Sequence, residues 1–548
     1  MQIKNVLNFF GLWSYPLGIT ISGMIDYFYH SISMQALTFN AKSISEILIG
    51  GLAVPAVVAI SNVYDYLIKG KTNFTPALSG KKDVTSISES KKKAMYPSIP
   101  SDLLSSKPEG FIVGRQGKSY VRIPIERANI MNSVIIGSPG SGKTSGPFLT
   151  TLIPNFMHDN PPITAFVLDI KPEIYKKCVG KNRCKNVKVV DFTDRSSYGW
   201  DVYHSLSKSS NMNEIIRVFD GIVRSLIVSS NPKDSFFVNN ARNIAKGLLL
   251  YHYAKGEGFI DSIKAIASED IMTHISNALQ DKEYCPEDGM VYALLKKYSD
   301  KQSDAFQDIE LTLAEHLNVF LNSDVQYHLR DNPLKASPQD LNDCISVFVC
   351  IPLPLLDEFG DLLRLITYQV CSAMEARGED WKSPVLMILD ELGRLGKIEN
   401  LKNLLSLGRS SGISVNMAFQ DMSQLEATYS KEGARTIINL SEVTCIFSCR
   451  DIETTKTLSY WGGEYREEKI SHNRSALLHQ GDGKQHISEE YRKILDISDI
   501  QSLRKSGEVI LFVEGKYYRT KQLRYYQDKL INARYQQIMK EQKIRNKE

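Results

Sequence analysis

One short stretch, Gly137–Thr144 with the sequence Gly-Ser-Pro-Gly-Ser-Gly-Lys-Thr, constrains this chain more than any other. An apolar run, Val134–Ile136, leads into it, and a second apolar pattern, Phe148–Ile153, follows it. This order of strand, glycine loop and helix is that of a P-loop, whose glycines let the backbone wrap so that its N–H groups point at a polyphosphate. The positive end of the following helix adds to the anion site. The sequence therefore predicts a nucleotide-binding protein.

The same stretch carries the side chains that a nucleotide and its metal ion require. Lys143 can reach the β- and γ-phosphates, and Thr144 offers a hydroxyl to Mg²⁺. We expect every residue of the loop to take part in binding: Gly137, Ser138, Pro139, Gly140, Ser141, Gly142, Lys143 and Thr144.

A second motif, Val385–Leu389 followed by Asp390 and Glu391, has the form of a Walker B strand. Asp390 would hold Mg²⁺, through water or together with Thr144, and Glu391 would orient and deprotonate the attacking water. A buried strand that ends in two acids is common in proteins of many kinds. Behind a P-loop, however, the pattern indicates the second half of a nucleotide site.

Two further candidates follow the Walker B strand. Arg409 lies at the expected end of a helix, and Gln420 ends the next apolar strand, Ile413–Phe419. Gln420 beside Walker B could sense the γ-phosphate, and Arg409 could be an arginine finger donated to a neighbouring subunit's site. From the residues alone, the alternative is that each is a surface or packing residue.

Apolar strands and helical patterns alternate from about Phe111, which predicts an α/β fold. Strand signals fade between about 210 and 340, where amphipathic patterns predict an inserted helical region with helices at Asn213–Leu226, Asn239–Ala254 and Gln307–Asn322. We expect the strands on both sides of the insertion to form one parallel sheet: Val134–Gly137, Ala165–Asp169, Val187–Val190, Ser346–Ile351, Val385–Leu389, Ile413–Phe419, Val443–Phe447 and Val509–Val513.

The N-terminal part predicts a membrane anchor. Residues 6–24 and 47–63 are two apolar stretches just long enough to cross a bilayer. Lysines flank the pair on the outer sides, which places both chain ends in the cytoplasm under the positive-inside rule. The alternatives are a signal peptide for the first stretch, or two buried core helices.

Two polar segments flank the α/β region. The linker that follows the anchor, rich in Ser, Lys and Pro, is either a solvated tether or a segment lying on anionic lipid. The C-terminal end is basic with interleaved tyrosines, and it either binds nucleic acid or a partner or is a solvated helix. The net charge of +4 does not by itself indicate a nucleic-acid binder. No HExxH motif and no pair of CxxC motifs occurs, which argues against a zinc protein.

The motifs together resemble the type IV secretion coupling proteins of the TraG/TraD family. The resemblance rests on 390–397, Asp-Glu-Leu-Gly-Arg-Leu-Gly-Lys, and on 407–412, Leu-Gly-Arg-Ser-Ser-Gly. Further agreement lies at 169–173, at 236–243 and at 451–454, and in the two N-terminal spans. There are departures: Pro172 replaces a glycine, Trp200-Asp201-Val202 stands where the family has Asn-Pro-Leu/Phe-Asp, and Ser138-Pro139 begins the loop. None of them touches Lys143, Thr144, Asp390 or Glu391.

The resemblance implies a membrane ATPase with a RecA-like core and an all-α domain, using ATP and Mg²⁺ and assembling as a homo-hexamer around a channel. It implies that Lys143, Glu391, Arg409 and Gln420 are catalytic, with Arg409 acting in trans, and that Thr144 and Asp390 hold the metal. The expected domains are a transmembrane anchor at 1–70, a linker at 71–108, a nucleotide-binding domain at 109–200 and 346–527, an all-α domain at 201–345, and a basic helix or tail at 528–548.

Such a protein would bring a relaxase–DNA complex, with single- or double-stranded DNA, to type IV secretion channel components at the bacterial inner membrane. Three alternatives stay open: an ATPase for protein effectors, a non-hydrolysing substrate receptor, and a chromosome-segregation DNA translocase. Glu391 argues against the receptor, and the small number of spans argues against the translocase. Nothing in the sequence separates DNA cargo from protein cargo.

Overall fold

The computed structural model describes residues 98–126, 129–158, 160–179, 186–206, 210–228, 235–299, 304–472 and 485–545. The chain divides into two compact units, residues 1–90 and 91–548, and all described residues belong to the second. The predicted spans at 6–24 and 47–63 therefore lie outside the described residues. Among the helices that the structure does describe, none is long and apolar enough to cross a membrane.

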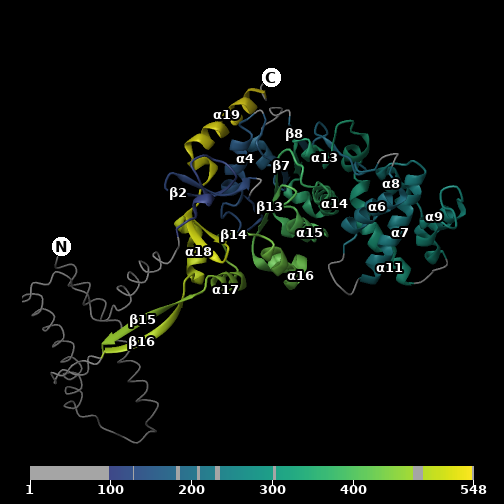
Figure 1. The fold of residues 1–548 in the computed structure, drawn as a ribbon. Coiled ribbons are helices and arrows are strands. Elements are labelled where there is room, and N and C mark those ends of the chain that lie inside the picture. The colour runs from purple at the N-terminus through teal and green to yellow at the C-terminus, as the bar shows by residue number, and fades with distance from the viewer. Residues whose placement is uncertain are drawn as a thin grey trace, which may run out of the picture. The chain divides into compact units, whose positions relative to one another are not determined.

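A 12-stranded sheet forms the centre of the described part (Figure 1). Its order is β1-β3-β2-β18-β17-β14-β6-β13-β12-β7-β11-β8. The strands are β1 (Leu104–Ser105), β2 (Phe111–Gln116), β3 (Ser119–Ile123), β6 (Ser133–Gly137), β7 (Thr164–Asp169), β8 (Val187–Asp191), β11 (Ser346–Cys350), β12 (Val385–Leu389), β13 (Ile413–Phe419), β14 (Val443–Ser448), β17 (Glu508–Val513) and β18 (Lys516–Lys521).

The sheet is mixed, and the prediction of one parallel sheet is wrong for its last strand. From β14 to β8 all neighbours are parallel, as expected, and strands from both sides of the insertion alternate there. The predicted strand Val509–Val513 (β17), however, pairs antiparallel with β14, and β18 and β2 continue antiparallel from it. The physical reason is that the direction of β17 is set by its pairing with β14, which an apolar run does not specify. The two-residue turn Glu514-Gly515 then reverses the chain, so β18 is antiparallel to β17. Residues 98–105, expected in the linker, form a turn and the edge strand β1.

Helices cover both faces of the parallel half, because successive side chains of each strand point to opposite faces. Val134 and Ile136 pack in one core with helices α14, α15, α16, α17 and α18, whereas Ile135 packs in the other with α4, α5 and α19. The helices are α4 (Leu149–Asn155), α5 (Ile174–Cys178), α14 (Leu356–Glu375), α15 (Leu401–Leu407), α16 (Met422–Asn439), α17 (Ile452–Trp461), α18 (Ile497–Ser506) and α19 (Lys529–Arg545).

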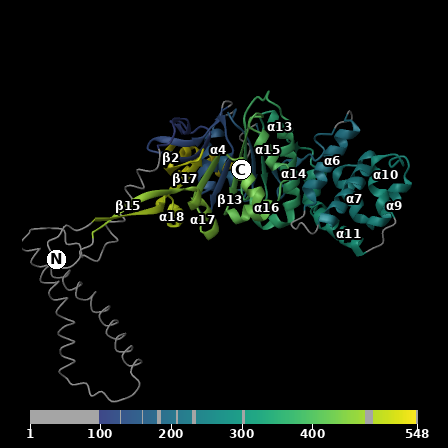
Figure 2. The ribbon, with the colours of Figure 1, turned by 60° about the horizontal axis from the view of Figure 1, so that its bottom comes forward.

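The predicted helical insertion is present between β8 and β11, and it lies beside α14 (Figure 2). Two short parallel strands, β9 (Gly199–Trp200) and β10 (Lys335–Ala336), hold its start and end together. Its helices are α6 (Met212–Leu226), α7 (Ser235–Ala254), α8 (Phe259–Ser268), α9 (Ile271–Gln280), α10 (Met290–Leu295), α11 (Asp304–Leu317) and α12 (Ser323–Gln326). Helix α13 (Gln339–Asn342) follows β10 and packs on β7 and β11.

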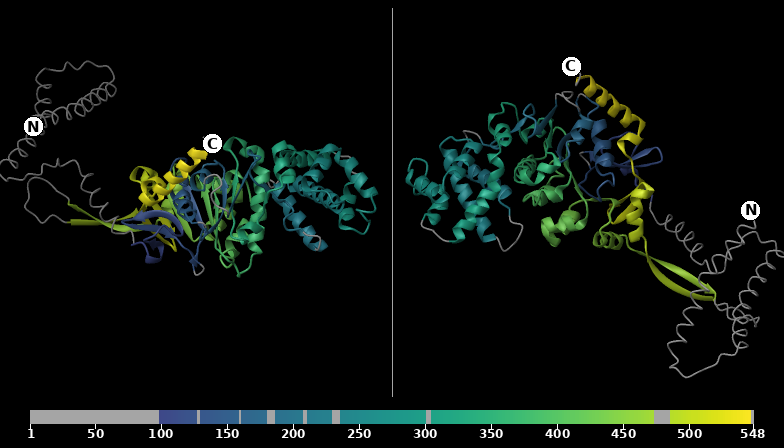
Figure 3. Two further views of the ribbon diagram at one scale, coloured as in Figure 1. Left: turned by 90° about the horizontal axis from the view of Figure 1, so that it is seen from above. Right: turned by 180° about the vertical axis from the view of Figure 1, so that it is seen from behind.

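Two C-terminal features differ from a simple tail. Helix α19 packs on α4 and α5 and buries Ile531 and Ile538, so this part of the basic terminus is integral to the fold. The strands β15 (Glu464–His472) and β16 (Gln485–Lys493) form a hairpin that extends away from the sheet (Figure 3). No strand was predicted from the sequence at either arm of this hairpin.

Candidate nucleotide site

The P-loop lies at the carboxyl end of β6, with the strand and helix on either side of it as predicted. Gly140 and Gly142 have φ values of +72° and +105°, in the left-handed region that favours glycine. The N–H of Gly146 donates to the carbonyl oxygen of Gly142 at 2.7 Å, so helical bonding begins within the loop. The glycines therefore allow the backbone turns of this loop.

Lys143 is folded into this loop. Its Nζ donates to the carbonyl oxygen of Gly137, and its side chain is buried. Burial lowers the pKa of Lys143, and the nearby carboxylates of Glu391 and Asp390 act in the opposite direction. The buried Lys143 ammonium group and the two carboxylates would be balanced by a phosphate group on the lysine and by Mg²⁺ on the acids.

The Walker B acids face the P-loop across β13. Thr144 Oγ1 donates to Asp390 Oδ2 at 3.2 Å, which brings together the two predicted metal ligands. The N–H of Glu391 donates to Asp390 Oδ1 at 3.1 Å, and Glu391 itself has a φ of +55°. A non-glycine residue in this conformation is strained, and such strain is typical of functional positions.

Gln420 joins the same group. Strand β13 lies between β6 and β12, so its carboxyl end brings Gln420 between the P-loop and Walker B. Gln420 Nε2 donates to Glu391 Oε2 at 3.0 Å, and its own N–H donates to Gln424 Oε1 at 3.1 Å. Gln420 therefore fixes the direction of the Glu391 carboxylate.

The buried acids of this edge hold their protons more tightly than acids in water. Burial and then the Glu391 charge raise the pKa of Asp390 to about 6, against the effects of Lys143 and Thr144. Asp169, at the end of β7, was not predicted as a site residue, and burial raises its pKa to about 7. Its Oδ2 accepts from the N–H of Tyr175 at 2.9 Å, in the first turn of α5. The sequence feature that could have identified Asp169 as a site residue is its position at the end of a buried strand, next to β12.

Arg409 lies apart from these residues. Arg409 precedes the amino end of β13, whereas Gln420 follows its carboxyl end. The strand rises by about 3.3 Å per residue over six residue steps, so its two ends lie about 20 Å apart. The Arg409 side chain is 55% exposed and lies 3.9 Å from Glu442 Oε1. Within one chain, Arg409 does not reach the nucleotide site.

The segment that follows β18 contacts the P-loop. The sequence did not predict this contact. Gln522 Nε2 donates to the carbonyl oxygen of Ser141 at 2.8 Å, and a Cβ on Gly142 would lie 2.1 Å from that nitrogen. The guanidinium of Arg504, on α18, lies 3.5 Å from the place of a Cβ on Gly140. No local motif marks these residues, because only the antiparallel half of the sheet brings them here.

The residues present fit Mg²⁺ and a nucleotide. The hydroxyl of Ser141 is buried in the loop without a hydrogen-bond partner, although the loop around it is polar. A threonine hydroxyl and a carboxylate lie within hydrogen-bond distance of each other, which is the oxygen donor set that Mg²⁺ prefers. Lys143 supplies the cation for the phosphates.

The sequence is similar to those of several known secretion and conjugation proteins. Type IV secretion system-coupling protein VirD4 of Bartonella henselae is 23% identical over 333 residues, which cover 60% of this chain and 50% of that protein. Conjugal transfer protein TraG of Rhizobium radiobacter is 24% identical over 353 residues, covering 60% of this chain and 52% of that protein. The chain thus spans about half the length of these relatives.

Solved structures show the same fold. The unbound bacterial conjugative coupling protein TrwBdeltaN70 has a TM-score of 0.60 at 13% identity, covering 79% of this chain and 91% of that chain. TrwB in complex with ADP and Mg²⁺ has a TM-score of 0.58 at 13% identity, with the same coverage. The fold is thus the α/β P-loop NTPase fold with a large mixed sheet. Residues 88–547 match the family described as Type IV secretory system Conjugative DNA transfer. This match confirms the predicted family, and the chain belongs to the type IV secretion coupling proteins of the TraG/TraD family.

Proposed function

We propose that this chain is a coupling ATPase that recruits relaxase–DNA substrate to a type IV secretion channel and drives its transfer by ATP hydrolysis. The observation that carries the proposal is the joining of two motifs 246 positions apart, through the 3.2 Å contact of Thr144 with Asp390, beside Lys143 and the Glu391–Gln420 pair. Relatives named as conjugal transfer and secretion-coupling proteins support the DNA-transfer part.

In this mechanism the chain's own residues each have one task. Thr144 and Asp390 would hold the metal, and Lys143 with the loop N–H groups would bind the phosphates. Glu391, aimed by Gln420, orients a water molecule and accepts its proton. When bound, Mg²⁺·ATP supplies the phosphoanhydride bond and the charge neutralisation for its cleavage.

Arg409 enters the proposal through a second subunit. A hexamer in which the exposed Arg409 of one subunit faces the nucleotide of the next would place a cation at the γ-phosphate. The anchor at 6–24 and 47–63 would hold such a ring at the inner membrane with both chain ends in the cytoplasm. The helical insertion would then face the cargo.

The test is ATP hydrolysis by the full chain, with and without single-stranded and double-stranded DNA. Lys143→Ala and Glu391→Gln should abolish hydrolysis in either condition, and DNA should stimulate the unchanged protein. Hydrolysis that is indifferent to DNA would favour protein effectors as cargo. Nucleotide binding without hydrolysis under every condition would favour the receptor and refute the mechanism.

The trans role of Arg409 has its own test. Arg409→Ala should lose hydrolysis, and mixing it with Lys143→Ala should restore part of it, because each mutant supplies what the other lacks. Glu442→Gln is the matched control, since it removes the ion pair and keeps the guanidinium. If Glu442→Gln loses as much activity as Arg409→Ala, or if mixing restores nothing, Arg409 is a packing residue.

A further inference from the structure

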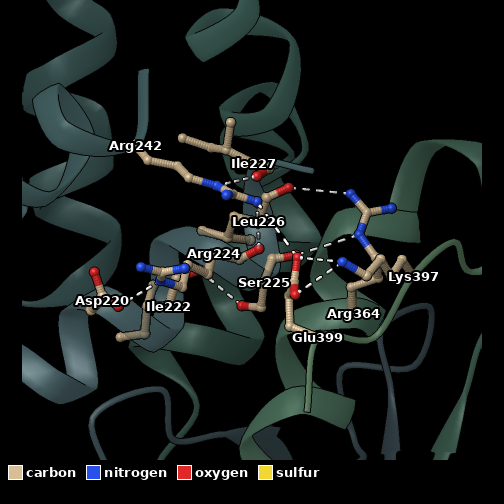
Figure 4. A network of polar contacts seen from close by, with 10 residues as sticks. All are labelled: Asp220, Ile222, Arg224, Ser225, Leu226, Ile227, Arg242, Arg364, Lys397 and Glu399. Carbon is tan, nitrogen blue, oxygen red and sulfur yellow. Dashed lines mark hydrogen bonds and ion pairs between the residues drawn. The ribbon is translucent and has the colours of Figure 1, made fainter. Parts of the chain in front are cut away.

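The C-terminal end of α6, in the helical insertion, is bound by two arginines from other elements (Figure 4). The last carbonyl groups of a helix have no partner within it and carry the negative end of its dipole. Here four successive carbonyl oxygens accept hydrogen bonds from Arg242 of α7 and Arg364 of α14. The four carbonyls belong to Arg224, Ser225, Leu226 and Ile227.

Arg364 connects this helix end to the segment that follows Walker B. Its Nε and Nη2 donate to the carbonyl oxygens of Ser225 at 3.4 Å and Leu226 at 3.2 Å. Its Nη1 donates to the carbonyl oxygen of Leu395 at 3.1 Å. The side chain is only 12% exposed and also pairs with Asp361 of its own helix. One guanidinium therefore binds two domains at once.

Arg242 makes a parallel connection. Its Nε donates to the carbonyl oxygen of Ile227 at 2.8 Å, and its Nη2 lies 3.8 Å from Glu399 Oε1. Glu399 also accepts from Lys397 Nζ at 3.1 Å. Both arginines thus contact the stretch between Walker B and α15, Arg364 at Leu395 and Arg242 at Glu399.

A short hydrogen-bonded turn carries the connection from Leu395 back to Glu391. The N–H of Arg394 donates to the carbonyl oxygen of Glu391 at 2.9 Å, and that of Leu395 donates to Leu392 at 3.1 Å. Glu391 is held in the strained left-handed conformation at the start of this turn. Moving the carbonyl of Leu395 would therefore turn the backbone of Glu391.

We propose that Arg364 is a positioning residue for Glu391, and that it transmits the position of the helical insertion to the water-activating carboxylate. This inference rests on the proposed function, since it concerns the same hydrolysis. An arginine is required because its planar fork offers several donors in fixed directions, whereas a lysine presents a single point of charge.

The first experiment separates positioning from packing. Arg364→Gln should lower kcat for ATP about tenfold while KM stays within about twofold, because Arg364 does not touch the P-loop. Arg364→Lys should not restore kcat. The control is Lys188→Gln, which removes a comparable contact between the sheet and the insertion, at Lys335 O (3.0 Å) and Asp340 (2.7 Å), far from Glu391. Equal losses in the control, or full activity with lysine, would overturn the inference.

A second measurement does not depend on hydrolysis. In the nucleotide-free protein, amide hydrogen exchange at Arg394 and Leu395 should become about tenfold faster in Arg364→Gln. It should stay unchanged in Lys188→Gln and in Lys143→Ala. Unchanged exchange in Arg364→Gln would overturn the inference even in a fully active enzyme. If the unchanged protein hydrolyses no ATP, the proposed function fails, and this exchange result still decides whether Arg364 holds the Glu391 turn.

Discussion

Asp390 offers a quantitative test of how the site is built. Its carboxylate is 8% exposed, and burial together with the Glu391 charge raises its pKa to about 6 from 3.8. A buried carboxylate that is ionised at neutral pH beside a second carboxylate destabilises the nucleotide-free protein. We therefore expect Asp390→Asn to be more stable than the unchanged protein at pH 7.5, although it should bind no Mg²⁺.

The magnitude follows from the pKa and two hydrogen bonds. A rise of about 2 pKa units corresponds to about 3 kcal/mol of lost stability once the group is ionised. The carboxylate accepts from Thr144 Oγ1 at 3.2 Å and from the N–H of Glu391 at 3.1 Å, and an asparagine can accept only one of these. Losing the other costs about 1 kcal/mol. The net gain in unfolding free energy at pH 7.5 is about 2 kcal/mol.

The sign of the pH dependence is fixed by the direction of the shift. A folded-state pKa above the unfolded value means that the native state binds the proton more tightly. The folding stability that this bound proton contributes is fully present below about pH 3.8 and is lost as the pH rises through about 6. The advantage of Asp390→Asn should therefore be largest at pH 7.5 and fall to about zero at pH 4.5, where native Asp390 is protonated.

The assay is urea unfolding of the full chain without Mg²⁺ and nucleotide, at pH 7.5 and 4.5. Asp451→Asn is the control of opposite sign, because hydrogen bonds from Thr454 lower the pKa of Asp451. That variant should lose stability at pH 7.5. If Asp390→Asn is the less stable protein at pH 7.5, or if its advantage is as large at pH 4.5, the carboxylate is not strained as argued.

Three further outcomes can be checked. Below pH 6 the affinity for Mg²⁺ with a non-hydrolysable ATP analogue should fall about tenfold per pH unit, measured by titration calorimetry with Asp390→Asn as the baseline. Gly142→Ala should cost about 1–3 kcal/mol of nucleotide binding because of its φ of +105°, and adding Gln522→Ala should restore only the part due to the 2.1 Å contact. Ile538→Ala should lower the unfolding free energy by about 2–4 kcal/mol because the Ile538 side chain is buried. If α19 were a solvated tail, this substitution would leave the unfolding free energy unchanged.

The residues of the nucleotide loop and Walker B could be found from sequence because their chemistry is local. Fixed spacing in Gly137–Thr144 sets the loop, and an apolar run ending in Asp390 and Glu391 sets the second strand. The strands of the parallel half were also predictable to within about a residue, since each is a continuous buried run bounded by polar residues. Gln420 followed from its place at the end of such a strand.

What the sequence could not give depends on pairing between distant segments. An apolar run does not state the direction of its neighbour, so the antiparallel β17 was misassigned. Gln522 and Arg504 reach the P-loop only through that pairing. Arg364 lies in an ordinary amphipathic helix, and its partners outside that helix are backbone carbonyls, which leave no trace in residue type.

Under the proposed function, the positions of Arg364 and Arg409 would divide the control of hydrolysis between two sources. Arg364 acts from within the chain, on the segment beginning at Glu391, and its other partners belong to the helical insertion. Arg409 lies before the amino end of β13, about 20 Å from the carboxyl end that carries the nucleotide site, so under the proposed function it would serve another subunit's nucleotide. Under the proposed function, the insertion would therefore set the base and the neighbouring subunit would set the charge at the γ-phosphate. Because both groups act on one transition state, their losses should not add: Arg364→Gln combined with Arg409→Ala should lower kcat by less than the product of the single effects.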